Sequence, residues 1–280
     1  MKSSKALLLL LIIGFVFVAL GCAKIYYASA DTHNTKETFS IASITKDSKD
    51  KPSVVYLGTA IDKKTKKKVE GYMFIDYKKG HGKPPWAGGG KKDKQSDAYV
   101  FLAKGARWKQ TESYILDTSN NHGMSNSFVS TTVATALETW DSQAAFNIFG
   151  NRNIFATVDG ADEIQPDNKN EIYFGSIAEP NVIAVTIVWG IFSGPPKNRE
   201  LVEWDQIYNQ DDFRWGDATI DPTVMDFQNI AAHEIGHAVG LGHPADQYTE
   251  ETMYRFADIG EIKKRDLHAG DIAGVKELYK

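Results

Sequence analysis

The sequence is almost free of cysteine: Cys22 is the only one among 280 residues, and it lies in a hydrophobic N-terminal segment. The chain that follows has no thiol pair for an internal disulfide, and it has no cysteine that could hold a structural metal. Any metal site beyond this segment must therefore use histidine, aspartate or glutamate.

Long hydrophobic runs are equally scarce, because the chain has a single one, Ala6–Ala23, which follows Lys2 and Lys5. A charged start and an apolar run are typical of an export signal. Three outcomes stay open: cleavage after Ala30, lipidation at Cys22, or retention as a membrane anchor, since 18 residues is the lower limit of a span. All three predict an extracytoplasmic protein, either secreted or membrane-anchored through its N-terminal segment.

The net charge of −4 hides an uneven distribution of charge. Residues 31–97 contain 15 Lys and Arg against 9 Asp and Glu, a net charge of +6, whereas residues 98–280 contain 14 against 27, a net charge of −13. We predict an export signal or N-terminal anchor at 1–30, a basic N-terminal region with a linker at 31–97, and a catalytic domain at 98–280. The opposite charges make the basic region a candidate pro-segment that docks on the acidic domain.

The basic region contains two predicted strands, Val54–Ile61 and Val69–Tyr77, joined by a lysine-rich turn. Residues 80–94 have the glycine, proline and lysine content of a flexible linker. The favoured interpretation is a solvated hairpin and linker. Binding of nucleic acid or anionic lipid by residues 63–94 stays open as an alternative, but no nucleic-acid partner is expected.

From residue 98 onward the pattern predicts an α+β (mixed α/β) domain. Apolar residues at helical spacing predict an amphipathic helix over 125–143, and further helices are predicted over 226–239 and 270–279. A turn-rich connection between the last two strands favours an antiparallel hairpin. The predicted strands are 114–116, 153–158, 171–177, 183–190 and 201–208.

The string HEIGHAVGLGH at residues 233–243 carries the chemistry. Side chains four residues apart lie on one face of a helix, so His233 and His237 can point at one metal ion. His243 lies too far along to share a straight helix, but Gly240 permits the left-handed conformation that ends helices and lets the chain reverse. Three histidines and one water are typical of a catalytic zinc site, so we predict Zn²⁺ held by His233, His237 and His243.

Glu234 is adjacent to a ligand and is predicted to reach the open side of the metal. Zinc lowers the pKa of its water to about 7, and a carboxylate within reach takes the proton as the water attacks a carbonyl. The competing interpretation is a structural zinc site, which is usually closed by four protein ligands. The sequence offers no obvious fourth ligand, so we expect the fourth position to be open.

This string, followed by Met253, resembles the metzincin zinc peptidases, and the TMY sequence at 252–254 is most similar to the matrixin subgroup. Residues 107–119 resemble the first matrixin strand, and residues 266–280 resemble the matrixin ending, with departures at Gly270 and Lys280. The resemblance implies a metzincin-like zincin domain with a twisted mixed sheet, an active-site helix and a Met-turn at Met253 below the zinc. It also implies an edge strand over about 183–190, to which a polypeptide substrate adds as an extended strand.

Two departures from the matrixin pattern matter. Animal matrixins are kept latent by a cysteine in the pro-segment, and this chain has no cysteine after Cys22. They also carry a His-rich structural zinc site in mid-domain, which we predict to be absent because no histidine lies between His122 and His233. An acidic loop is a candidate Ca²⁺ site, although a solvated loop is the favoured interpretation. Its residues are Asp159, Asp162, Glu163 and Asp167.

The predicted function is a zinc-dependent endopeptidase that acts outside the cytoplasm, with Glu234 as general base. The alternative is a non-catalytic zinc-bearing protein of surface binding or attachment, which has no need of a carboxylate at that position. The sequence leaves open the substrate, the cleavage specificity, the role of residues 31–97 and the oligomeric state.

Overall fold

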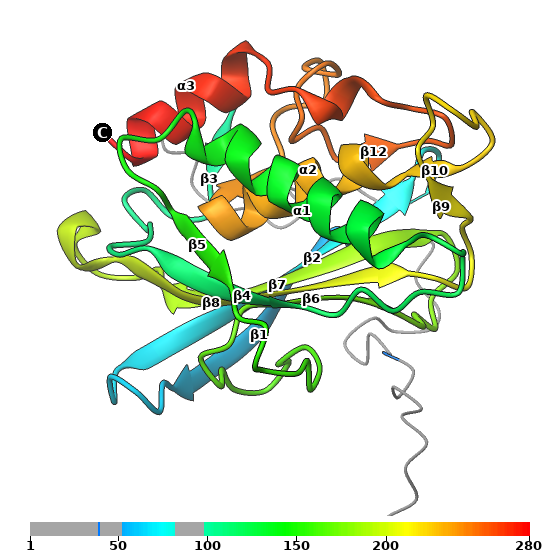
Figure 1. Cartoon of the computed structure of the whole chain (residues 1–280). Helices are drawn as coiled ribbons and strands as arrows, with labels where there is room; N and C mark the ends of the chain where they lie inside the picture. Colours follow the sequence, from blue (N-terminus) through cyan, green and yellow to red (C-terminus); the bar gives the residue numbers. More distant parts are fainter. Residues whose placement is uncertain (1–38, 40–51, 82–97) are drawn as a thin grey trace, which may run out of the picture. The chain divides into compact units, whose positions relative to one another are not determined.

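The computed structural model of the chain describes residues 39, 52–81 and 98–280 (Figure 1). The predicted leader, including Cys22, and nearly all of the predicted linker lie outside these residues. In the part of the chain that is described, no helix combines the length and apolarity needed to cross a membrane.

A mixed sheet forms the centre of the structure, in the order β1-β2-β7-β8-β6-β4-β5. Neighbours from β1 to β8 run antiparallel, and those from β8 to β5 run parallel. This sheet and its helices confirm the predicted α+β class. Its strands are β1 (Val54–Ile61), β2 (Lys68–Lys78), β4 (Glu112–Leu116), β5 (Phe149–Arg152), β6 (Glu171–Gly175), β7 (Val182–Ile191) and β8 (Glu200–Asn209).

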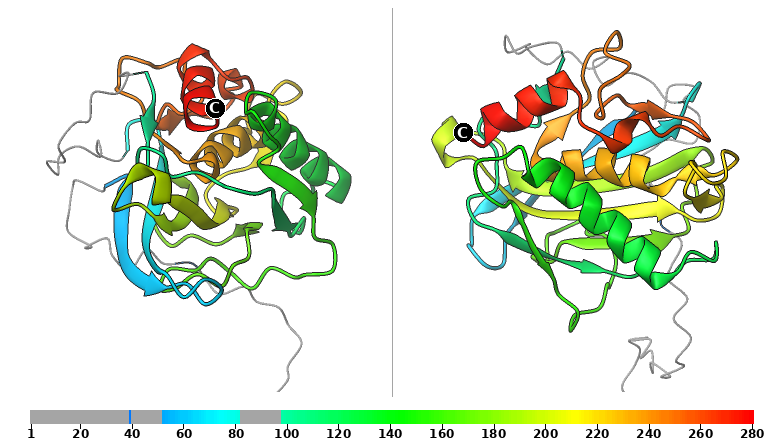
Figure 2. Two further views of the ribbon diagram at one scale, coloured as in Figure 1. Left: turned by 90° about the vertical axis from the view of Figure 1, so that its left-hand side faces the viewer. Right: turned by 45° about the horizontal axis from the view of Figure 1, so that its top comes forward.

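Three α-helices lie on one face of the sheet (Figures 1 and 2). Their bounds agree with the predicted ranges to within a residue or two. They are α1 (Asn126–Asp141), α2 (Phe227–Val239) and α3 (Ala269–Leu278). Short pairs of strands and two 3₁₀ turns complete the fold: β3 (Val100–Phe101) with β11 (Leu241–Gly242), β9 (Trp215–Gly216) with β10 (Met225–Asp226), η2 (Pro196–Asn198) and η3 (Lys263–Arg265).

Side-chain caps and buried indoles fix the helix that carries the metal-binding motif. Asp226 precedes α2, and its carboxylate accepts the backbone N–H of Asn229 at 2.8 Å, which supplies a partner for one unpaired donor of the first turn. Trp140 on α1 donates its indole N–H to the carbonyl of Ala232 at 2.8 Å. Trp108 does the same to the carbonyl of Ala238, also at 2.8 Å. These contacts hold α2 against α1 and against the segment before β4.

The loop between β5 and β6 lies on the opposite face of the sheet from the helices (Figure 1). We predicted a strand over 153–158, and this was wrong: the strand is β5, and it ends at Arg152. Ile154 and Phe155 are 71% and 94% exposed, so their apolar character reflects neither a buried strand nor a core. The Arg152 guanidinium donates to the carbonyl of Leu116 at 2.5 Å and thereby closes the end of β5 on β4.

The β1–β2 hairpin of the basic region belongs to the same sheet as the catalytic motif. Both predicted strands are present, and β2 pairs with β7 along eight residues, from Glu70 opposite Gly190 to Tyr77 opposite Val182. On its other side β2 also pairs in parallel with β12 (Phe256–Ala257). We predicted β7 to be an edge strand, and in this structure it is internal because β2 covers its edge.

The close approach of β2 to β7 depends on a glycine. A Cβ added at Gly71 would lie 2.8 Å from the Trp189 ring, which is fully buried. Only a residue without a side chain lets this indole lie directly on the backbone of β2. Val69, Met73 and Ile75 of β2 are also fully buried on this face, so the hairpin is packed as tightly as a core strand.

Candidate metal centre

Helix α2 and the turn that follows it bring three histidines together. His233 and His237 lie one turn apart on α2, and both are buried. Gly240 ends the helix with a φ of 111°, in the left-handed region, and its N–H donates to the carbonyl of His237 at 2.9 Å. The chain then reverses through β11 and places His243, which is 4% exposed, beside the other two rings.

The three imidazoles turn their Nε2 atoms toward a common point. His233 Nδ1 donates to the carbonyl of Thr252 at 2.6 Å, and His237 Nδ1 donates to the carbonyl of Leu241 at 2.8 Å. A carbonyl can only accept, so these bonds place the proton on Nδ1 and leave the Nε2 lone pair free for a metal. The Nε2 atom of His237 is buried and has no hydrogen-bond partner. This donor set fits Zn²⁺.

Burial keeps the ligands in the form that binds a metal. It lowers the pKa of His233 to about 4 and that of His243 to about 3, and the charge of a neighbouring carboxylate only partly opposes this shift. Both imidazoles are therefore neutral at physiological pH, as metal ligands must be. The other described histidines, His81, His122 and His268, take no part in this cluster.

A carboxylate that the sequence did not reveal lies at the centre of the cluster. Asp76 on β2 places Oδ1 at 3.1 Å from Nε2 of both His233 and His243, and Oδ2 at 3.8 Å from Nε2 of His237. It is 4% exposed, and the ligand atoms of all four residues lie within 4.8 Å of one another. We expected no fourth protein ligand, and this was wrong, because the ligand comes from a strand distant in sequence.

The electrostatics of Asp76 fit a role as ligand. Burial alone would raise its pKa, but the polar contacts of the carboxylate with the surrounding imidazoles hold the pKa of this carboxyl well below its usual range. Two positions earlier on β2, Phe74 stacks on His237 with ring centroids 4.1 Å apart and planes 18° apart. The strand thus contacts the cluster through two side chains that point the same way.

Glu234 lies next to the cluster, between α2 and β7. Its Oε2 accepts the hydroxyl of Thr186 at 2.5 Å, while Oε1 is buried without a partner. Burial and the nearby charge of Asp76 raise the pKa of Glu234 well above its usual value. A buried carboxyl oxygen of Glu234 thus remains free beside the metal position.

Met253 packs against α2, where the Met-turn was predicted. It is 2% exposed, and a Cβ added at Gly236 would lie 2.1 Å from its sulfur. The carboxylate of Asp271 on α3 accepts the N–H groups of Thr252 and Met253 at 2.6 and 3.1 Å, which fixes the turn. The sequence alone did not reveal the roles of Gly236 and Asp271, although the first lies within HEIGHAVGLGH and the second within residues 266–280.

A second cluster lies on the other face of the sheet, where Asp162 meets Glu203 and Asp205 of β8. Glu203 is fully buried, and its Oε1 has no partner. Burial and the charges of the neighbouring carboxylates raise the pKa of Glu203 to about 9 and that of Asp205 well above its usual value. Three carboxylates in one buried cluster need a cation or protons to be stable.

The predicted calcium loop supplies only part of this cluster. Asp162 belongs to it, whereas Asp159 and Asp167 form ion pairs with Lys169. Burial raises the pKa of the fourth predicted residue, Glu163, which is not among the cluster's ligands. Glu203 and Asp205 were missed because they alternate with apolar residues on a strand, where polar residues are expected to face solvent.

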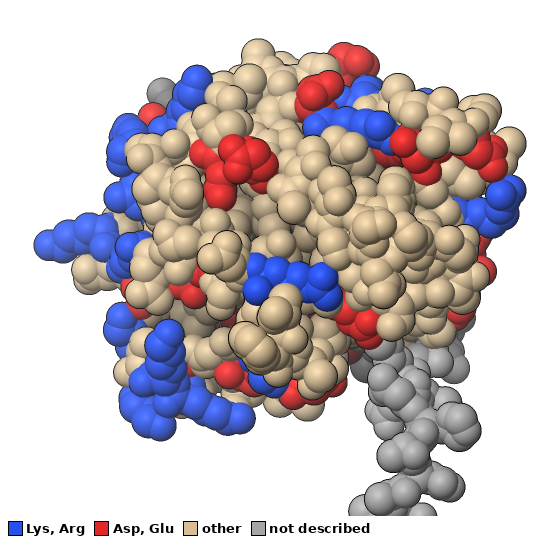
Figure 3. Space-filling model, in the orientation of Figure 1, with Lys and Arg blue, Asp and Glu red and all other residues tan. Residues whose placement is uncertain are grey.

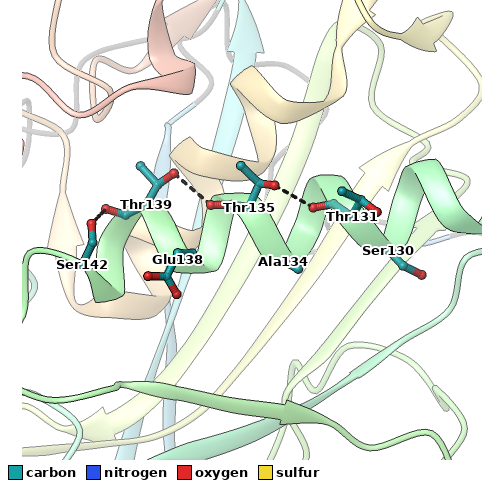
Figure 4. A pocket seen from close by; sticks show the side chains of 7 residues that line it. All are labelled: Ser130, Thr131, Ala134, Thr135, Glu138, Thr139 and Ser142. Atoms are coloured by element: carbon teal, nitrogen blue, oxygen red, sulfur yellow. Dashed lines mark hydrogen bonds between the residues drawn. The ribbon is translucent and has the colours of Figure 1, made fainter.

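A surface depression lies away from the histidine cluster, along α1 (Figure 4). It measures about 650 Å³, and threonine and serine hydroxyls line it. Three of these hydroxyls donate to carbonyls of the same helix: Thr135 to Thr131, Thr139 to Thr135 and Ser142 to Thr139. They are therefore already satisfied, and the depression offers no chemistry to compare with the histidine cluster.

Basic side chains gather along one side of the molecule (Figure 3). Several line a second depression of about 390 Å³, close to the C-terminus, among them Lys104, Arg107, Lys197 and Arg199. Arg107 donates to the carbonyl of Leu278 at 2.7 Å, and Arg199 donates to that of Lys104 at 3.0 Å. These guanidinium groups tie loops together, so the depression is in part a structural feature of the fold.

Comparison with known proteins matches residues 195–280 to the matrixin family of peptidases. The chain is similar to matrix metalloproteinase-19 of Mus musculus, with 36% identity over 92 residues, 31% of this chain and 16% of that protein. It is also similar to metalloendoproteinase 5-MMP of Arabidopsis thaliana, with 40% identity over 57 residues, 20% of this chain and 15% of that protein. Metalloendoproteinase 1 of Glycine max is 38% identical over 66 residues, 23% of this chain and 21% of that protein. The matched segments thus span about a fifth or less of these relatives.

Proposed function

We propose that this chain, which is similar to the matrixins over residues 195–280, is a zinc-dependent endopeptidase that hydrolyses polypeptides outside the cytoplasm. The observation that carries this proposal is the convergence of three buried Nε2 atoms beside the carboxyl of Glu234. His233, His237 and His243 would hold the metal. When bound, zinc supplies Lewis acidity toward the substrate carbonyl and lowers the pKa of a water molecule.

Glu234 is the proposed general base and acid. Its carboxylate takes the proton from the attacking water and then delivers it to the leaving amine. The Thr186 hydroxyl, which donates to Oε2, holds the side chain so that Oε1 faces the site. Gly240 and Met253 support the site: the first allows the reversal toward His243, and the second packs under α2. The substrate would lie as an extended strand along β7, pairing with its backbone groups.

Calcium is the proposed second cation, at the cluster of Asp162, Glu203 and Asp205. Carboxylate oxygens are the ligands that Ca²⁺ prefers, and Glu203 offers a buried oxygen without a partner. This donor set contains carboxylate oxygens and no histidine nitrogen. Calcium here would fasten the β5–β6 loop to β8.

Export is proposed from the N-terminal segment, whose charged start and apolar run precede the described residues. The relatives are named as matrix metalloproteinases and metalloendoproteinases, which suits action outside the cytoplasm. Signal cleavage, lipidation at Cys22 and retention as an anchor remain the three alternatives at the leader.

A second candidate function has one observation in its favour. Asp76 completes a set of four protein ligands, which is typical of structural zinc sites, so a non-catalytic zinc-bearing surface protein is the alternative. Cleavage of an unfolded polypeptide distinguishes the two. The full chain and an Asp76→Ala variant, both loaded with zinc, are assayed with and without a chelator, and Glu234→Ala versions serve as controls. Chelator-sensitive cleavage that requires Glu234 supports the peptidase; no cleavage by any form rejects it.

A further inference from the structure

We propose that the β1–β2 hairpin is an internal inhibitor, which occupies the peptide-binding slot as a surrogate strand and covers the metal with Asp76. This inference rests on the proposed function and concerns the regulation of the same site. It gives the basic N-terminal region a role, and it supplies the latency group that the absence of a pro-segment cysteine left unassigned.

The slot has the shape of an extended chain. β2 pairs antiparallel with β7 on one side and parallel with β12 on the other, where Phe256 lies opposite Tyr77. A peptide can bind in such a slot only by forming the same backbone hydrogen bonds, because β7 has no other free edge. While β2 is in place, the donors and acceptors that a substrate strand would use are already paired.

The metal position is closed by the same strand. The Asp76 carboxylate lies among the three histidines, and the Phe74 ring stacks on the His237 ring. A carboxylate in this place takes the coordination position that an attacking water needs. The pairing of β2 with β7 therefore both covers the metal position and fills the peptide slot. Departure of the hairpin would open both at once.

The hairpin is seated by contacts at both ends of β2 as well as along it. At the β1–β2 turn, Asp62 accepts the side-chain amide of Asn168 at 2.8 Å, and Lys67 pairs with Glu200 at 2.5 Å. At the other end, Lys78 lies 3.8 Å from Asp258. Lys67 and Lys78 belong to the net positive region, and both pair with acidic residues of the net negative domain, as expected of a docked inhibitor.

Cobalt provides a test that does not depend on catalysis. Co²⁺ binds the same kind of donor set as Zn²⁺, and an added anion such as azide changes its visible spectrum only where a coordination position is open. In the full-length chain loaded with Co²⁺, azide should leave the spectrum unchanged. In Asp76→Ala it should shift the spectrum. Glu70→Gln removes a different carboxylate from the same strand, and this variant should behave like the parent.

Cleavage then tests the slot. Gly71→Val places a side chain against Trp189 and should unseat β2 from β7. With zinc bound, cleavage of an unfolded polypeptide should rise at least about tenfold in Asp76→Ala combined with Gly71→Val, and less in either single variant. Circular dichroism reports whether each variant folds. If Asp76→Ala does not fold, Asp76→Asn replaces it, because it keeps the shape of the side chain but binds metal more weakly.

Each outcome bears on one claim. Azide binding to the parent as strong as to Asp76→Ala would overturn the closure by Asp76, and equal cleavage by parent and double variant would overturn the occupied slot. Azide binding confined to the Asp76 variants, with no cleavage by any form, would retain the closure and reject the peptidase. Either of the first two results contradicts this inference, and the last contradicts the proposed function alone.

Discussion

Two buried clusters lie on opposite faces of one sheet, and they solve the problem of buried charge in different ways. Around Asp76, three imidazoles surround a single carboxylate. In the other cluster, the carboxylates of Asp162 and Asp205 lie beside that of Glu203, and no histidine belongs to it. The first cluster has nitrogen donors suited to zinc, and the second has only oxygen donors suited to calcium. Side-chain chemistry, rather than burial, thus distinguishes the cations that each face would bind.

The largest expected effect comes from removing a nitrogen donor. In the Asp76→Ala background, His237→Ala should abolish both zinc retention and cleavage, because only His233 and His243 remain as ligands and a catalytic zinc site takes three. Metal analysis after dialysis measures the first, and peptide cleavage by the Asp76→Ala form measures the second. Asp205→Asn should keep its zinc. Equal zinc content in the His237→Ala variant and its parent would remove the distinction between the clusters.

The next effect separates metal binding from chemistry. Glu234→Gln in the Asp76→Ala background should keep its zinc and lower kcat by a factor of about 10² to 10⁴, the usual contribution of a general base. The amide cannot take a proton from water, but it preserves the size of the buried side chain. Metal analysis and steady-state kinetics provide the two readouts. A variant that keeps full kcat would exclude Glu234 as the base.

A smaller effect concerns the packing below the zinc cluster. Gly236→Ala should destabilise the fold by about 1–3 kcal/mol, since the added methyl group overlaps the Met253 sulfur and the Trp140 ring. Thermal unfolding measures the loss. Adding Met253→Ala should recover part of it, because the two sites are in direct contact. Additive losses in the double variant would mean that the two residues do not meet.

The smallest effect belongs to the acidic cluster. Calcium at about 100 times its dissociation constant should stabilise the fold by about 2.7 kcal/mol, if it binds only the folded state. The unfolding temperature should rise accordingly, and Asp205→Asn should not respond. Asp211→Asn, at an exposed carboxylate just beyond β8, is the matched control. If calcium does not change the unfolding temperature of the parent protein, the cluster does not bind calcium, and protons rather than a cation stabilise its carboxylates.

Local signals carried most of what the sequence predicted. The helix of the HEIGH motif, the turn at Gly240 and both strands of the hairpin follow from patterns within a few residues, and the structure has them where expected. Asp76 could not be found in this way, because FIDY has no metal-binding spacing of its own and meets His233 only through sheet pairing. Glu203 was missed for a related reason: the local pattern places a polar residue of a strand toward water, and only the folded sheet shows that this one is buried.

The Trp189 indole contacts both the β1–β2 hairpin and the loop beside the acidic cluster. Its ring lies on Gly71 of the hairpin, and its N–H donates to the carbonyl of Asp162 at 2.7 Å, beside the acidic cluster. Departure of β2 would expose this fully buried indole to water and shift its fluorescence emission to longer wavelength. Ordering of the Asp162 loop would change the same emission through the hydrogen bond. A single chromophore therefore gives an optical signal for both events, without any label.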